Sequence, residues 1–166
     1  MKYWQAGIWF IGALILQPFL YNLAPGFGIT PNLILCLTVI FTFLYEDKLF
    51  GIILGSTFGL IYDICYGQFV GVAAFDLALV ATIILILREW TNVENIFTVV
   101  VIGLISTWFY NTVYWVIMHF AGSPYGYLFV LSKMPWYALL NLIVIMIVYF
   151  ILIKRVVKHR RDRYFQ

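Results

Sequence analysis

Charged residues are scarce in this sequence. Asp, Glu, Lys and Arg together make up 10% of its 166 residues, whereas a typical soluble domain carries about 25%. The few charges fall in short clusters between long apolar runs, and 64% of all residues are hydrophobic. So little polar surface cannot cover a globule in water, and the apolar runs have the length of membrane-spanning helices. The composition therefore excludes a soluble domain and indicates an integral membrane protein.

Residues that build metal centres and catalytic sites are also few. The two cysteines, Cys36 and Cys65, lie in or beside apolar runs without a neighbouring histidine or a CxxC spacing, so neither a metal site nor a disulfide framework is expected. The sequence lacks HExxH, GxSxG, a phosphate-binding glycine loop and a plausible Ser/His/Asp set. We therefore expect no enzyme, no metal and no cofactor, although an intramembrane active site built from Asp63 and Asp76 stays open.

Six apolar runs, each bounded by charged or turn residues, predict the fold class. They cover residues 4–23, 31–45, 49–66, 71–87, 96–120 and 135–153. We expect an all-α integral membrane protein, with a bundle of six transmembrane helices in a single domain at 1–153. The second run is short, because about 15 helical residues rise only about 22 Å across a hydrocarbon layer of about 30 Å. It needs interfacial flanks, a locally thinned bilayer or cover by neighbouring helices.

Turn residues predict how the first three helices connect. Residues 24–28 read Ala-Pro-Gly-Phe-Gly and should break the chain after the first helix. Thr30 and Pro31 should act as N-cap and first residue of the second helix. Residues 46–48, Glu-Asp-Lys, leave room only for a tight reversal, so the second and third helices should form an antiparallel hairpin.

The distribution of Lys and Arg predicts the orientation in the membrane. Lys2, Lys48, Arg88 and a basic tail at 154–166 share one side of the predicted bundle, and Lys133 lies on the other. The tail cations are Lys154, Arg155, Lys158, Arg160, Arg161 and Arg163. The first side should be the cytoplasm, which gives an N-in and C-in topology. We expect the first run to be a retained helix and not a signal peptide, since no A-x-A cleavage site follows it. The tail should contact anionic lipid headgroups and not nucleic acid.

Small residues recur with a spacing of four in and after the third run. The period runs through Gly51, Gly55, Gly59, Asp63, Gly67 and Gly71. The first four should lie on one face of a helix. Small residues let another backbone approach closely, which is how helices associate in lipid. This face should pack inside the bundle or against a partner; packing inside the bundle is the favoured interpretation.

A few polar residues lie within or next to the apolar runs. An acid at membrane depth is costly unless it is paired, hydrated or protonated, so Asp63 and Asp76 are candidates for a functional role. Both could instead be hydrated at the outer interface, or cap the turn at 67–71. Asn111 and Asn141 are candidate buried polar residues that should hydrogen-bond between helices. His119 should face the outer headgroups and not a metal.

The glycine and aspartate pattern resembles the family of the bacterial rod shape-determining protein MreD. The similarity is carried by residues 51–63, by Gly67 and residues 71–75, and by the later Pro135 and Asn141. Small size, several spans and a short basic tail also agree. The resemblance implies a non-enzymatic scaffold of the cell-elongation complex in the bacterial cytoplasmic membrane. It would bind the bitopic protein MreC and act with MreB, the glycosyltransferase RodA and its transpeptidase in peptidoglycan synthesis.

The same family is similar in fold to the S-components of energy-coupling-factor vitamin transporters, which are also six-helix bundles. A substrate-binding S-component is therefore the alternative function. S-components often dock through an A-x-x-x-A face on the first helix, and here Ala6, Gly7, Gly12 and Ala13 have no such register. For the scaffold, the glycine face of residues 51–63 is the expected partner surface, with Asp63 fixing the register or orienting the outer loop.

Overall fold

The computed structural model describes residues 3–23, 29–45, 47–91 and 95–164, without the side chains of residues 3, 23, 48 and 154–164. Throughout these residues the regular structure is helical. The helices are α1 (Tyr3–Leu23), α2 (Leu33–Leu44), α3 (Lys48–Tyr66), α4 (Val72–Arg88), α5 (Ile96–Phe120) and α6 (Tyr127–Tyr164). Four of them, α1, α3, α5 and α6, are long and apolar enough to cross a membrane. The expected all-helical membrane fold is confirmed.

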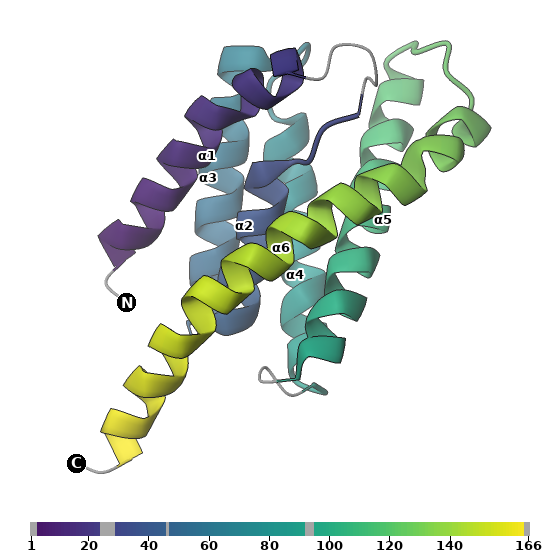
Figure 1. Ribbon diagram of the computed structural model, residues 1–166. Coiled ribbons are helices and arrows are strands. Elements are labelled where there is room, and N and C mark those ends of the chain that lie inside the picture. Colours follow the sequence, from purple (N-terminus) through teal and green to yellow (C-terminus); the bar gives the residue numbers. More distant parts are fainter. Residues whose placement is uncertain (1–2, 24–28, 46, 92–94, 165–166) are drawn as a thin grey trace.

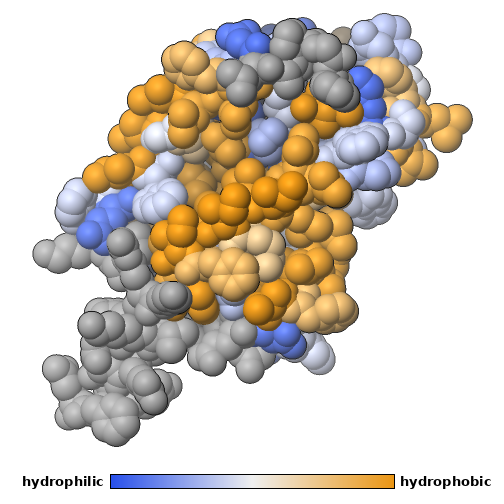
Figure 2. All heavy atoms as spheres, in the orientation of Figure 1, coloured by the Kyte–Doolittle hydropathy of each residue, from blue (hydrophilic) through white to orange (hydrophobic). Residues whose placement is uncertain are grey.

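Successive helices run in opposite directions through the bundle. In Figure 1 both chain ends point towards the end that holds the α2–α3 and α4–α5 connections, and the other three connections lie at the opposite end. We call this opposite end the outer end, after the predicted orientation. Figure 2 shows an apolar band across the middle of the molecule, with polar residues gathered towards both ends.

The predicted spans agree with helices α1 to α5 within two residues, and the apolar part of the sixth ends at Ile153 as predicted, but the predicted start of the sixth was wrong. Helix α6 begins at Tyr127 and not at residue 135, and its backbone stays helical to Tyr164, so the first part of the basic tail extends the helix. Pro135 lies inside α6. A proline frees one carbonyl in a helix interior, and transmembrane helices tolerate this because neighbouring groups can satisfy it.

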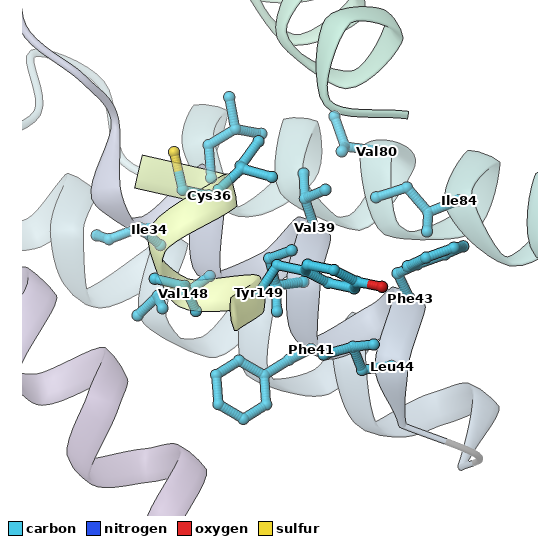
Figure 3. Packing of buried hydrophobic residues seen from close by; sticks show 14 of the residues in the cluster. Ile34, Cys36, Val39, Phe41, Phe43, Leu44, Val80, Ile84, Val148 and Tyr149 are labelled. Carbon is cyan, nitrogen blue, oxygen red and sulfur yellow. The ribbon is translucent and has the colours of Figure 1, made fainter. Parts of the chain in front are cut away.

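Helix α2 is the centre of the bundle. Every residue from Ile34 to Leu44 is buried, and α2 contacts all five other helices. Figure 3 shows side chains of α2 next to Val80 and Ile84 of α4 and next to Val148 and Tyr149 of α6. Of the three ways to accommodate a short second helix, the structure shows cover by neighbours. The N-cap is Asn32 and not Thr30, because the Asn32 side chain accepts a hydrogen bond from the Leu35 N–H.

The glycines of α3 bring it close to α2 and α4. A Cβ atom on Gly51 would lie 2.7 Å from Cα of Thr42 on α2, and one on Gly59 would lie 2.9 Å from Cα of Ala74 on α4. A Cβ atom on Gly55 would lie 2.7 Å from Cγ2 of Thr38. The glycine face is therefore filled by α2 and α4, which leaves no room there for the partner helix that the sequence suggested. The tight α2–α3 hairpin is confirmed, with Asp47 as the N-cap of α3.

We predict that Gly51→Ala destabilises the bundle by about 1–3 kcal/mol, because the new methyl group overlaps the Thr42 backbone and forces the two helices apart. Gly12→Ala on α1 is the matched control, since a Cβ atom there would meet nothing within 4 Å. Thermal unfolding of both purified variants in the same detergent gives the comparison. Equal melting temperatures would contradict the close α2–α3 contact.

Candidate functional site

The outer end of α2 lies inside the bundle, and side chains from two other helices hold it. Gln17 of α1 donates from Nε2 to the Pro31 carbonyl and accepts the Leu33 N–H at Oε1, both at 2.9 Å. Asn141 of α6 accepts the Asn32 N–H at 2.8 Å. Backbone groups in a membrane interior need protein partners because water is absent. Gln17 and Asn141 therefore provide hydrogen-bond partners for the backbone groups at the start of this short helix.

Asn141 also ties two further elements to this point. Its Nδ2 donates to Thr107 Oγ1 of α5 at 3.2 Å, and the Cys36 thiol of α2 lies 3.6 Å from its Oδ1. The side chain is buried, with an exposed fraction of 2%. The expected hydrogen bonding of Asn141 between helices is confirmed, and it joins α2, α5 and α6.

The opposite end of α2 is held by a cation. Arg88, in the last turn of α4, donates from Nη1 to the carbonyls of Thr42, at 3.3 Å, and Tyr45. Carbonyls at a helix C-terminus lack partners within the helix, and a positive charge there also interacts favourably with the helix dipole. Arg88 thus has a structural role in addition to the orientation bias predicted from its charge.

Asp63 caps α4 across the α3–α4 turn. Its Oδ2 accepts the Gly71 N–H at 3.0 Å and the Ala73 N–H at 2.8 Å, and its exposed fraction is 4%. Gly71, the N-cap of α4, has φ of +98°, a conformation that favours glycine, and it offers no side chain for capping. A Cβ atom on Gly67 would lie 2.7 Å from the Asp63 carbonyl oxygen. The capping interpretation of Asp63 is therefore confirmed.

Asp76 of α4 is in a different situation. It is fully buried, and neither carboxylate oxygen has a hydrogen-bond partner among the residues that the structure describes. Thr42 Oγ1 is likewise buried and unpartnered there. Asp76 is thus neither hydrated at the outer interface nor a cap of the turn. Because Asp63 is engaged in capping, an active site shared by the two acids is not favoured.

A cavity of about 900 Å³ lies at the outer end of the bundle. It occupies the region beyond the N-terminus of α2, between α1, α3, α5 and α6. Its walls include aromatic and amide side chains from all four helices, and they include Gln17, Tyr21, Tyr62, Asp63, Tyr66, Tyr110, Asn111, Tyr114, Lys133, Tyr137 and Asn141. Ligand pockets commonly have volumes of about 300–1,000 Å³. This cavity is the best candidate in the described part of the chain for a binding site.

The remaining polar residues that the sequence suggested as site candidates lie in different environments. Asn111 is half-buried and lines the cavity, and its Nδ2 donates to the Thr107 carbonyl one turn earlier on α5. The expected burial and interhelical bonding of Asn111 are therefore wrong. His119 is exposed and stacks on Trp115, with ring centroids 5.0 Å apart. The side chains of the tail cations Lys154, Arg155, Lys158, Arg160, Arg161 and Arg163 lie outside the described residues.

Sequence reasoning missed Gln17 and the cavity. The available signal was a glutamine next to a proline in an apolar run, since an amide at membrane depth needs a partner.

No group of three or more His, Cys, Asp or Glu residues that could hold a metal ion occurs within the described ranges.

Comparison with known protein families matches residues 2–158 to the family described as rod shape-determining protein MreD. No curated protein and no solved structure matches the chain. The family match covers every helix except the last residues of α6, so the resemblance carried by the glycine and aspartate pattern is confirmed. The expected likeness to S-components finds no support in these comparisons.

We predict that Asp63→Ala lowers stability by about 2–3 kcal/mol, because it removes a charged acceptor from two backbone N–H groups in a buried turn. Asp63→Asn keeps one acceptor oxygen and should lose less. Thermal unfolding in detergent ranks the wild type and the two variants. If Asp63→Ala unfolded at the wild-type temperature, the capping role would be refuted.

Proposed function

The chain belongs to the rod shape-determining protein MreD family, and we propose that it is a non-enzymatic scaffold of the bacterial elongation complex. It is a multi-pass protein of the cytoplasmic membrane with a role in determining rod shape. In the proposal it crosses the membrane six times, with both ends in the cytoplasm. It binds the bitopic protein MreC, acts through MreC with MreB, RodA and its transpeptidase, and helps to direct lateral peptidoglycan synthesis. The family match over residues 2–158 carries this proposal.

The buried and half-buried polar side chains fit a scaffold because several of them hold helices together. Gln17, Asn141 and Arg88 bind the ends of α2, and Asp63 binds the start of α4. Each is thus committed to a backbone group. A rigid bundle of this kind can present a fixed surface to a partner helix.

Helix α1 offers the best partner surface now that the glycine face of α3 is filled. Within the described residues α1 packs only against α2 and α3. Its outward side carries large exposed side chains, including Ile8, Ile11 and Ile15. Among them lie Gly7 and Gly12, where an added Cβ would meet nothing within 4 Å. Half-buried glycines with open space at the Cβ position allow close approach of a second helix, which is favourable in lipid. We assign the single transmembrane helix of MreC to this side of α1.

A substrate-binding S-component is the alternative function, and the cavity at the outer end favours it. The two functions predict different molecules that co-purify with the protein. Tagged protein extracted from its native membrane should bring down an MreC-like bitopic protein and elongation enzymes. Recovery of ATP-binding subunits or a bound vitamin, as identified by mass spectrometry, would instead establish the transporter.

We predict that Gly12→Leu leaves the bundle folded but reduces MreC recovery by about tenfold or more, because the leucine keeps the partner helix away from α1. Thr82→Leu adds a similar apolar bulk at an exposed position of α4 and serves as the control. Co-purification from cells expressing both proteins gives the measurement, and size-exclusion chromatography verifies folding. Normal MreC recovery with Gly12→Leu would exclude this side of α1.

We predict that a membrane-impermeant maleimide labels Cys65 in intact cells with a permeable outer barrier. Cys65 is exposed near the outer end of α3, whereas Cys36 is buried, so the chain carries a single accessible thiol among the described residues. The control is Trp90→Cys in a Cys65→Ser background, because Trp90 is exposed at the opposite end of the bundle. It should react only after the cells are opened. The reverse pattern would contradict the N-in and C-in topology.

A further inference from the structure

We propose that the cavity at the outer end binds the headgroup of an anionic phospholipid from the outer leaflet, through the phosphodiester and hydroxyl groups of that headgroup. This inference goes beyond the scaffold function, and it concerns the inner surface of the bundle and not the MreC-binding side of α1.

The walls offer hydrogen-bonding groups that the fold does not use. Tyr62, Tyr66 and Tyr114 line the cavity, and their hydroxyl groups have no hydrogen-bond partner among the described residues. Asn111 donates from Nδ2 to the Thr107 carbonyl, and its Oδ1 has no hydrogen-bond partner among the described residues. Phenol hydroxyls donate to phosphate oxygens, and amide oxygens accept from hydroxyl groups. The cavity is therefore suited to a headgroup with both kinds of group.

The charges in the cavity favour an anion. Among the described lining residues Lys133 is the only cation and Asp63 the only acid. The Asp63 Oδ2 is taken by the N–H groups of Gly71 and Ala73. Lys133 is half-buried, and its Nζ lies 4.9 Å from the ring centroid of Phe129, another cavity residue, with no carboxylate bound to it among the described residues. An ammonium group at a partly dry site attracts a phosphate, whose charge-assisted hydrogen bonds are the stronger kind.

The position of the cavity favours a lipid over a soluble ligand. The cavity lies at the outer end of the bundle, and its walls include the exposed turn residues Gln68, Phe69, Gly122 and Tyr125. Figure 1 shows the α3–α4 and α5–α6 connections at this end, and in Figure 2 polar residues lie there, beyond the apolar band. Aromatic and polar side chains at the edge of an apolar band lie at the level of lipid headgroups. A headgroup at this level can therefore occupy the cavity while its acyl chains stay in the lipid.

Native mass spectrometry of the full chain, purified in a neutral detergent and incubated with phosphatidylglycerol or phosphatidylcholine, tests the proposal. The wild type should retain phosphatidylglycerol and little phosphatidylcholine. Lys133→Gln should lower phosphatidylglycerol retention by about tenfold, the effect expected from loss of one charge-assisted hydrogen bond. The Tyr62→Phe and Tyr114→Phe double variant should lower it as well. Lys48→Gln, which removes a cation at the opposite end of the bundle, should stay within about twofold of the wild type.

Three outcomes would overturn the proposal. Lys133→Gln could retain as much phosphatidylglycerol as Lys48→Gln does, which would place the lipid elsewhere. Phosphatidylcholine could be retained equally well, which would remove the preference for an anion. Millimolar inorganic phosphate could displace the lipid and raise the melting temperature as much as the lipid does, which would identify a free-phosphate site. Each result leaves the MreC co-purification unchanged, so it does not bear on the scaffold function.

Discussion

The bundle depends on one constraint, which is that its central helix is too short to cross the membrane. Helix α2 has 12 residues and rises about 18 Å, whereas the hydrocarbon layer is about 30 Å thick. Its terminal N–H and C=O groups therefore lie inside the bundle and away from bulk water, where an unsatisfied group would cost up to several kcal/mol. Gln17 and Asn141 at one end and Arg88 at the other remove this penalty. These residues belong to α1, α6 and α4. Their hydrogen bonds to the ends of α2 therefore also fix the positions of those three helices.

The same shortness produces the cavity. The surrounding helices extend further towards the outer end than α2 does, so the region beyond its N-terminus lacks a central helix and is bounded by tyrosines and amides. Towards the other end, Gly51 of α3 lets α2 pack closely, since a Cβ atom there would lie 2.7 Å from Cα of Thr42. A tightly packed half and a hollow half thus follow from the position of one helix along the bundle axis.

Much of this fold could be predicted from the sequence, because apolar runs bounded by charges define helices well. The start of α6 could not, since Pro135 marks a helix start in most contexts and is interior here. The spacing of four predicted a helix face, but it contains no information on which neighbour fills that face. Gln17 and Arg88 are single polar residues whose partners lie 16 and 46 residues away. The cavity results from the relative lengths of several helices, which no single segment reveals.

Helix α1 connects three features that the sequence presents separately. Its Gln17 holds the start of α2, its Pro18 and Tyr21 line the cavity, and its Gly7 and Gly12 have open space where a side chain would lie. Displacement of α1 would break both Gln17 hydrogen bonds and expose buried backbone groups, at a cost of about 1–3 kcal/mol for each. A partner helix on the outward side must therefore bind α1 in its present position. A scaffold requires rigid docking of this kind, because the partner is then held in a defined orientation relative to the bundle.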